Sequence, residues 1–388
     1  MNGPIIKNSD VNKKPEGINA QGLKNKSEKA LLENEKLFLN KSLILAIESK
    51  CFDRIENLIK EGANINFQGE DGKTVLINAI ESKNLEVVKL LVEKGADLNI
   101  QDDWGYTALK YSFGNKFILK YLLEQNIDVN IPNRKGTTPL MFFIKNSKEL
   151  GVKEKEIIEL LIEKGADINV MTKNNSSALS FAVEKLNYDV VELLFKKGAN
   201  LNDSLLINYN WCGSTLLMYS IYKEQFDIAL LLIEKGVDVN QTNVYKDCAI
   251  IVAINKNNET IVKKLIEKGA HLNLKDFLGN NLIFGALKNV NIVKMLVDAG
   301  IPFDERDSIG QTPLMCAARD NCKETLEYLL EKGAQVNTKC KNNMTALDYS
   351  ILNKNDEISE ILLKKGAKIR FFQNIFDLKE CYRLYKLK

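Results

Sequence analysis

Few residues of this chain have the chemistry and spacing that a catalytic or metal site needs. The chain contains one histidine, His271, and seven cysteines that form no CxxC pair. One histidine with scattered cysteines cannot assemble the four-ligand set of a zinc site. The phosphate-binding pattern GxxxxGK[ST] is absent from the sequence. The sequence therefore predicts a protein without catalytic residues, cofactor or metal, whose function is binding.

The two cysteines nearest to each other in sequence are Cys316 and Cys322, in the segment "CAARDNC". We interpret both as packing residues, because a redox role would require an activated thiolate. An odd number of scattered cysteines predicts free thiols in a reducing compartment. No apolar run reaches membrane-spanning length, and the N-terminus lacks the apolar core of a signal peptide. We expect a cytoplasmic protein, with export to a host by another route left open.

Glycines recur along the chain, most often at a step of 33 residues, as from 62 to 95 and from 300 to 333. Most of them close a phrase such as "LLVEKGADLN", which returns as "LLIEKGADIN" and "LLIEKGVDVN". A period of this size is typical of a solenoid, in which each unit contacts only its neighbours. The recurring glycines are Gly62, Gly95, Gly165, Gly198, Gly236, Gly269, Gly300, Gly333 and Gly366.

Each unit contains two stretches with helical periodicity. In one copy the first runs from Thr312 to Asp320 and the second from Cys322 to Ala334. Leucines spaced at i, i+3 and i+4 in the second stretch predict an amphipathic helix. Gly333 then provides the left-handed residue that ends such a helix without a Cβ penalty.

The start of the unit also repeats, with a Thr two residues before a motif leucine in several copies. The motif position holds Leu43, Leu76, Leu109, Leu140, Leu179, Leu217, Ile250, Ile283, Leu314 and Leu347. Together with the Gly-Ala-Asp-Val-Asn motif that ends the unit, this pattern resembles the ankyrin repeat family. About ten copies of the repeat can be recognised in this chain. The resemblance implies an all-α solenoid of antiparallel helix pairs with β-turn fingers, right-stacked into a curved array. The family's histidine is replaced by Met141, Met218 and Met315 in three copies, where apolar packing can substitute for its hydrogen bonds.

Ankyrin repeat proteins bind partners with their finger tips and with the concave face of the first helices. The variable finger positions of the family fall on several aromatic or apolar residues here, and Trp and Tyr dominate binding hot spots. The finger residues that the resemblance implies as a partner-binding site are Trp104, Tyr106, Trp211, Tyr245, Phe277 and Ile309. The alternative is that each ring lies flat on its neighbouring finger.

The concave positions of the first helices, five and six residues after the motif leucine, are rich in lysine. A basic groove would favour a protein partner with an acidic segment; solvated lysines are the alternative. The partner-binding residues implied here are Tyr222, Lys223, Lys256, Lys288 and Arg319.

The composition divides the chain into four segments. We expect a disordered polar segment over 1–27, a helix over 28–40 that can cover the first repeat, repeats over 41–368, and a basic capping helix over 369–388. Two copies are longer than the rest, with an insertion near Lys153 and an enlarged finger before Leu217. Insertions of this kind map to loops that often border a binding face.

These patterns predict a non-enzymatic scaffold without a small-molecule substrate. We expect it to bind a protein partner through the groove and the fingers, as a monomer. The alternatives are an effector or inhibitor acting on a host or competitor protein, and nucleic-acid binding through the basic groove and tail. A net charge of +3 argues against a uniformly basic nucleic-acid binder.

Overall fold

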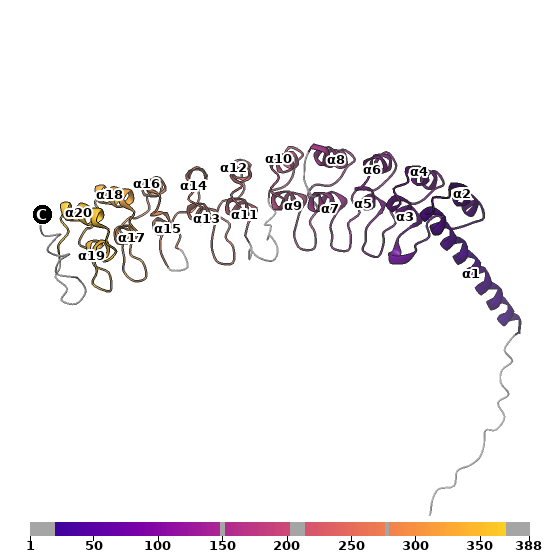
Figure 1. The fold of residues 1–388 in the computed structure, drawn as a ribbon, viewed down its shortest axis with the longest axis horizontal. Helices are drawn as coiled ribbons and strands as arrows, with labels where there is room; N and C mark the ends of the chain where they lie inside the picture. Colours follow the sequence, from indigo (N-terminus) through magenta and orange to yellow (C-terminus); the bar gives the residue numbers. More distant parts are fainter. Residues whose placement is uncertain (1–19, 148–151, 202–213, 276–278, 370–388) are drawn as a thin grey trace, which may run out of the picture. The chain divides into compact units, whose positions relative to one another are not determined.

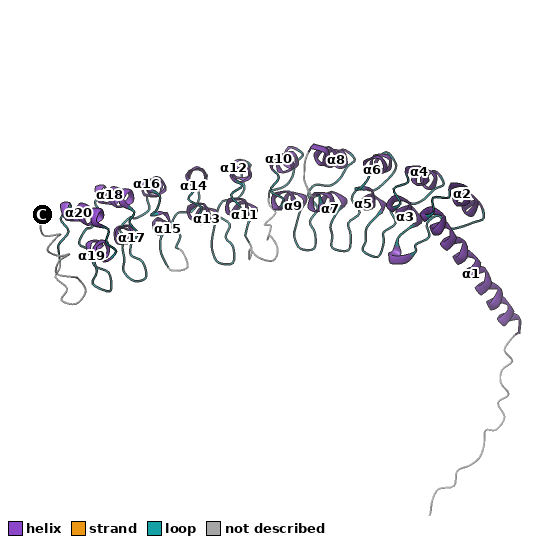
Figure 2. Cartoon of the chain, in the orientation of Figure 1, coloured by secondary structure: helices purple, strands orange, loops and turns teal. Residues whose placement is uncertain are grey.

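The computed structural model describes residues 20–147, 152–201, 214–275 and 279–369. Secondary structure in these residues is helical, and β pairing is limited to isolated bridges between Gln68 and Thr74 and between Lys275 and Asn281 (Figure 2). Short helices follow one another as hairpins separated by longer loops (Figure 1). The chain forms two compact units, residues 1–134 and 135–388.

The first unit consists of three helix pairs and one short 3₁₀ turn. Its elements are α1 (Ala20–Glu48), α2 (Phe52–Lys60), η1 (Glu70–Gly72), α3 (Val75–Glu81), α4 (Leu85–Glu93), α5 (Ala108–Ser112) and α6 (Lys116–Leu123). In the second unit the same alternation continues. Its elements are α7 (Pro139–Asn146), α8 (Val152–Glu163), α9 (Ala178–Glu184), α10 (Tyr188–Lys196), α11 (Leu216–Tyr222), α12 (Phe226–Glu234), α13 (Ala249–Asn255), α14 (Glu259–Glu267), α15 (Leu282–Ala286), α16 (Val290–Asp298), α17 (Pro313–Arg319), α18 (Lys323–Glu331), α19 (Ala346–Leu352) and α20 (Asp356–Lys364).

Local sequence explains where these helices begin and end. Thr312 caps α17 by accepting a hydrogen bond from the Met315 backbone N–H at 3.4 Å, and Pro313 occupies the first turn, where its missing N–H is no loss. Past the end of α4, Gly95 has a φ of +89° and allows the Ala96 N–H to reach the Leu91 carbonyl at 2.9 Å. The helix pair predicted around Gly333 is confirmed as α17 and α18.

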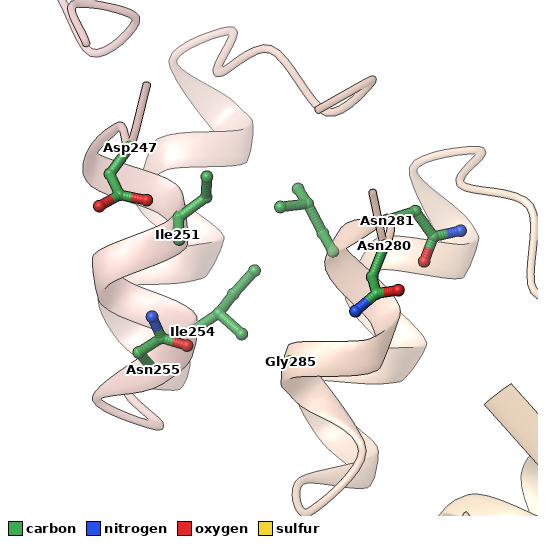
Figure 3. Close-up of a pocket in the computed structure, with 8 residues that line it drawn as sticks. Asp247, Ile251, Ile254, Asn255, Asn280, Asn281 and Gly285 are labelled. Atoms are coloured by element: carbon green, nitrogen blue, oxygen red, sulfur yellow. The ribbon is translucent and has the colours of Figure 1, made fainter. Parts of the chain in front are cut away.

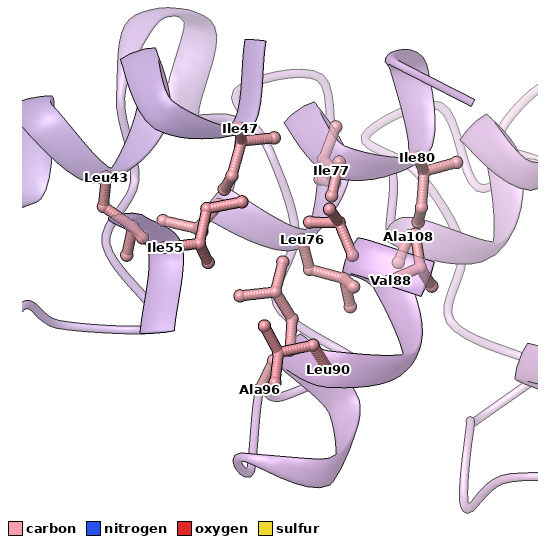
Figure 4. Close-up of a cluster of buried hydrophobic side chains, with 14 of the residues drawn as sticks. Leu43, Ile47, Ile55, Leu76, Ile77, Ile80, Val88, Leu90, Ala96 and Ala108 are labelled. Carbon is pink, nitrogen blue, oxygen red and sulfur yellow. The ribbon is translucent and has the colours of Figure 1, made fainter. Parts of the chain in front are cut away.

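The core lies between the two helix layers of each unit. In the second unit the first helices α11, α13 and α15 pack side by side, and the second helices α12, α14 and α16 form the other layer. In the first unit, apolar residues from α1 to α6 form one buried cluster, in which Leu43, Ile55 and Leu76 are almost completely buried (Figure 4). Burying each such side chain stabilises the fold by about 1.5–3 kcal/mol.

The predicted replacement of the family's histidine by apolar packing is consistent with the burial of Met141, Met218 and Met315. The fingers are joined instead by an asparagine in each of several copies. Asn240 Oδ1 accepts a hydrogen bond from the His271 N–H at 2.7 Å, 31 residues further along. We name this series the asparagine ladder; it comprises the pairs Asn66–Asp97, Asn99–Asp128, Asn169–Asn200, Asn240–His271 and Asn337–Lys368.

The N-terminal helix differs from the expected segment boundaries. α1 begins at Ala20, within the segment 1–27 that the composition predicts to be disordered, and continues into the first repeat without a break at residue 40. The insertion near Lys153 is partly accounted for by α8, whose 12 residues exceed the nine of α10. The enlarged finger before Leu217 and the expected helix over 369–388 fall almost entirely outside the described residues.

Candidate functional site

The second residue after the motif leucine lies at an equivalent position of the first helix in each repeat copy. We name this series the aromatic column, because rings occupy five of its ten positions: Tyr111, Phe142, Phe181, Tyr219 and Tyr349. Two of its rings are contacted from the preceding repeat. Lys145 Nζ lies 4.8 Å from the Phe181 centroid, and Gln311 Nε2 donates a hydrogen bond of 2.6 Å to the Tyr349 hydroxyl. The rings thus fill space between successive first helices.

The aromatic column is interrupted in three successive repeats, where the residues are Val252, Gly285 and Cys316. Two hollows lie beside this interruption, one on each side of α13. Asp247 and Asn255 line both of them. Two of these small residues, Val252 and Gly285, therefore coincide with open space on the first-helix face of the second unit.

The first hollow, which we name the tyrosine groove, has a volume of about 350 Å³. Its lining comes from α11, from the finger before α13, and from α13 itself. The residues that line it are Ser214, Met218, Tyr222, Asn243, Tyr245, Asp247, Val252, Asn255 and Lys256. Three residues predicted separately from finger and helix positions, Tyr222, Tyr245 and Lys256, are thus brought together at one site.

Aromatic and apolar surface is exposed around the tyrosine groove. Tyr245 and its neighbour Val244 are each 68% exposed at the finger tip, and Tyr222 is 40% exposed at the end of α11. The Asn243 side chain holds this finger in shape by accepting hydrogen bonds from the Tyr245 and Asp247 N–H groups, both at 2.9 Å. Tyr219, in the same helix as Met218 and Tyr222, is buried, and burial raises its pKa.

The charge of the groove is lower than its lysines suggest. Lys256 Nζ lies 4.7 Å from the Tyr222 ring centroid and forms a 2.7 Å ion pair with Glu224. Lys223 is exposed and lies 5.9 Å from the same ring centroid. The charge of Lys256 is therefore partly neutralised by Glu224. Of the two lysines near the Tyr222 ring, Lys223 is the exposed one.

The second hollow, which we name the glycine hollow, lies between α13 and α15 and has a volume of about 240 Å³ (Figure 3). Ile251 and Ile254 form its wall on α13, and Leu282 and Gly285 form its wall on α15. Its polar lining comprises Asp247, Asn255, Asn280 and Asn281. Gly285 occupies the position at which other repeats carry a ring.

A separate cluster surrounds the predicted finger residues of the first unit. Trp104 is 47% exposed, whereas the half-buried Tyr106 ring lies 4.8 Å from Lys110 Nζ. Burial lowers the pKa of Lys110, although nearby Asp102 acts in the opposite direction. Tyr106 is thus partly covered by a lysine of its own repeat, and Trp104 is an accessible surface residue.

The remaining predicted residues of the second unit do not line either hollow. Ile309 is 48% exposed at its finger tip, and Lys288 is exposed next to α15. Arg319 is bound by its own chain: two of its nitrogens contact the Asp320 carboxylate at 2.8 and 3.1 Å, and a third donates to Gln311 Oε1 at 2.9 Å. Hydrogen bonding to Asp320 raises the pKa of Arg319, which remains a cation. Trp211 and Phe277 lie outside the described residues.

In the described part of the chain, Cys248, Cys316 and Cys340 are buried packing groups, Cys322 is half-buried and Cys51 is exposed. Burial raises the pKa of the Cys316 thiol to about 12 and raises those of Cys248 and Cys322. A raised pKa suppresses the reactive thiolate. No group of three or more His, Cys, Asp or Glu side chains able to hold a metal occurs among the described residues.

Sequence reasoning missed the lining residues Met218, Asp247, Val252 and Asn255, and it missed the glycine hollow. A usable signal was present. Aligning the copies on their motif leucine shows the aromatic column and its loss at Gly285, but a missing ring becomes a hollow only when the neighbouring helices keep their spacing.

Hairpins of short helices, stacked in two layers and joined by finger loops, define a helical repeat protein. The family model for ankyrin repeats matches residues 43–133, 114–204, 203–276 and 282–372. The chain belongs to the ankyrin repeat family. The predicted all-α repeat solenoid is thereby confirmed, and protein–protein interaction is the general function that this family membership supports.

Curated relatives match only part of this chain. An ankyrin repeat protein of Acanthamoeba polyphaga mimivirus is 32% identical over 123 residues, covering 30% of this chain and 16% of the relative. One from Fowlpox virus is 32% identical over 130 residues, covering 33% of this chain and 31% of the relative. Among solved structures, the ankyrin repeat domain of Bcl-3 is 25% identical with a TM-score of 0.48, and the match covers 58% of this chain and 97% of that one.

Both viral relatives are matched over less than a third of their own length. Across the helices that the structure describes, none has the length and apolar character needed to cross a membrane.

Proposed function

We propose that this chain is a non-enzymatic interaction scaffold that binds a protein partner through the tyrosine groove and the finger beside it. The observation that carries the proposal is the exposure of Tyr245, Val244 and Tyr222 around a hollow of about 350 Å³. Exposed aromatic and apolar side chains at the edge of a concave site are typical of binding surfaces. The free thiols of the described cysteines suit a reducing compartment such as the cytoplasm.

The groove favours a partner that presents aromatic and apolar side chains at its centre. Acidic residues of the partner would then contact the rim, where Lys223 is exposed beside Tyr222. Rim charges chiefly increase the rate of association, whereas buried apolar contacts supply most of the affinity. A partner with an acidic flank and an apolar centre fits both features.

Affinity capture from the native organism, with mass spectrometry to identify bound proteins, tests the proposal. The Tyr222→Ala/Tyr245→Ala variant should lose most of a partner that the wild type captures, because it removes both exposed rings of the groove. Tyr188→Ala is a matched control, since Tyr188 is also 40% exposed but lies on the second-helix layer, in α10. Equal recovery by all three proteins would place the binding surface elsewhere.

A salt series on the captured complex separates this function from nucleic-acid binding. Phosphate contacts release counterions, so nucleic-acid binding would weaken steeply with salt and would persist without either tyrosine. Binding centred on apolar groove contacts should change little between low and moderate salt. Retention of nucleic acid by the double tyrosine variant, with a steep salt dependence, would contradict the proposed function.

A further inference from the structure

The glycine hollow repeats a geometry that the chain elsewhere fills with a tyrosine. In a later copy, Gln311 precedes the capping Thr312 of α17, and its Nε2 donates to the hydroxyl of Tyr349, 38 residues further along. The residue in the corresponding place before α13 is Asp247, and 38 residues further along is Gly285. The polar partner of the ring is therefore present in this copy, and the ring is missing.

The space left by the missing ring is large enough for one. The glycine hollow measures about 240 Å³, and an apolar cavity of about 150 Å³ in another protein accommodates benzene. Ile251, Ile254 and Leu282 provide the apolar walls that a ring needs, and Figure 3 shows Ile251 and Ile254 directed from α13 toward the Gly285 helix.

We propose that the glycine hollow is a receptor for a tyrosine side chain of the protein partner, with its hydroxyl donating a hydrogen bond to the Asp247 carboxylate. The inference rests on the proposed function, because it assumes that a protein occupies the first-helix face of the second unit. It adds the identity of one side chain that this partner must present.

Two features favour tyrosine over other side chains. An aliphatic side chain would leave the carboxylate of Asp247 with only the long 3.5 Å hydrogen bond from Asn243 Nδ2 as water is displaced, and poorly paired polar groups oppose binding. Within the first unit, the Tyr111 hydroxyl already donates to an aspartate, Asp102, at 2.5 Å, so a phenol and a carboxylate form this pair in the same fold. Phenylalanine and lysine are the competing occupants that an experiment must separate.

Side-chain analogues test the receptor without knowledge of the partner. The full chain, labelled at isoleucine methyl groups, is titrated by NMR with p-cresol, with toluene and with n-butylamine, which represent Tyr, Phe and Lys. We expect p-cresol to shift the Ile251 and Ile254 methyl signals saturably, with several-fold tighter binding than toluene. Tighter binding of toluene or of n-butylamine would overturn the assignment to tyrosine, as would the absence of p-cresol shifts at these methyl groups.

Two variants locate the binding and test the hydroxyl acceptor. Gly285→Tyr should fill the hollow with the chain's own ring and abolish the p-cresol shifts at Ile254. Its Cβ would meet only the Ile254 Cγ2 methyl closely, at 3.3 Å, which a small side-chain movement relieves. Asp247→Ala should reduce the preference for p-cresol over toluene to about unity, since the hydrogen-bond acceptor is gone. Unchanged p-cresol binding in either variant would overturn the proposal.

The outcome is distinguishable from failure of the proposed function. If capture by the wild type is unaffected by Tyr222→Ala/Tyr245→Ala, the proposed function fails whatever the probes do. If capture depends on those tyrosines but p-cresol does not bind at Ile251 and Ile254, the function stands and the tyrosine receptor is wrong.

Discussion

The hydroxyl of Tyr111 donates a 2.5 Å hydrogen bond to Oδ2 of Asp102, whose other oxygen accepts the N–H groups of Trp104 and Tyr106 at 2.9 and 2.8 Å. Asp102 is only 5% exposed. One carboxylate therefore fixes the finger that carries Trp104 and joins it to the helix that carries Tyr111. The hydrogen bond from the Tyr111 hydroxyl thus connects α5 to the aspartate that holds this finger.

Tyr111→Phe should destabilise the first unit by about 1.5 kcal/mol, because it removes a hydrogen bond to a charged group. Hydrogen exchange in the finger, residues 98–107, and in α5 provides the measurement. Exchange in α17, far along the sequence, serves as the internal control. Equal protection of the finger in both proteins would show that the two backbone hydrogen bonds suffice to hold Asp102.

The same pair predicts a dependence on pH. Burial, together with the hydrogen bond to Asp102, raises the pKa of Tyr111 above its ordinary value. The unfolded chain would release this proton near pH 10, while the folded chain retains it, so the stability contributed by Tyr111 is complete below about pH 10 and declines above it. The stability difference between wild type and Tyr111→Phe should narrow as the pH rises from about 9 to about 11. If urea unfolding gave the same stability difference between the two proteins across this pH range, the raised pKa of Tyr111 would be contradicted.

Two glycines at equivalent finger positions separate backbone strain from contact between fingers. Gly105 and Gly279 have φ values of +83° and +82°, but a Cβ on Gly105 would lie 2.7 Å from the Arg134 backbone nitrogen, whereas one on Gly279 meets nothing within 4 Å. Gly279→Ala should cost about 1 kcal/mol, from the left-handed conformation alone. Gly105→Ala should cost more, about 2–4 kcal/mol, because backbone must also move.

Thermal or urea unfolding of the two alanine variants measures that difference. Equal losses of stability would mean that the fingers at Gly105 and Arg134 separate easily, and that the close approach contributes little to the fold.

We propose that α1 caps the first repeat, in keeping with the role expected for residues 28–40. Asn40 Oδ1 accepts a hydrogen bond from the Asn64 N–H at 2.7 Å, which resembles the contacts of the asparagine ladder with a helical residue as the acceptor. Asn40→Ala should destabilise the first helix pair by about 1 kcal/mol. Faster hydrogen exchange over 52–66, with α4 unchanged, is the expected result; uniform exchange across the unit would argue against a local cap.

Thiol labelling tests the burial of the cysteines. Cys51 is exposed, whereas burial raises the pKa of Cys316 to about 12 and that of Cys248 in the same direction. A maleimide or iodoacetamide reagent applied near pH 8 should therefore modify Cys51 first, with Cys316 and Cys248 protected until the chain unfolds. Peptide mass spectrometry gives the order. Rapid labelling of Cys316 in the native protein would show that the Gln311–Arg319 network opens readily.

The repeated leucines and glycines were sufficient to predict the helix pairs, because both act locally. The motif leucine is buried in every copy that has one. A glycine after a helix end allows the chain to turn through its own positive φ, whatever the rest of the fold. The tyrosine groove was predicted in part for a similar reason: Tyr222 and Tyr245 occupy finger and helix positions that the repeat itself brings to one face.

The charge of the site was not predictable in the same way. Lys256 and Arg319 occupy basic positions of the first helices, yet each meets a carboxylate, Glu224 and Asp320 respectively, on its own chain. Side-chain pairing of this kind depends on rotamers and on the turn after the helix. The recurrence of basic residues at the ends of the first helices does not specify this pairing.

The asparagine ladder has a consequence for how such a chain can change. Each rung joins one side chain to one backbone N–H about 30 residues further along, so duplicating a copy that carries a rung supplies the new donor with an acceptor of the same kind. Evolution, or an engineer, can therefore lengthen this protein in steps of one copy while leaving the tyrosine groove and the glycine hollow intact.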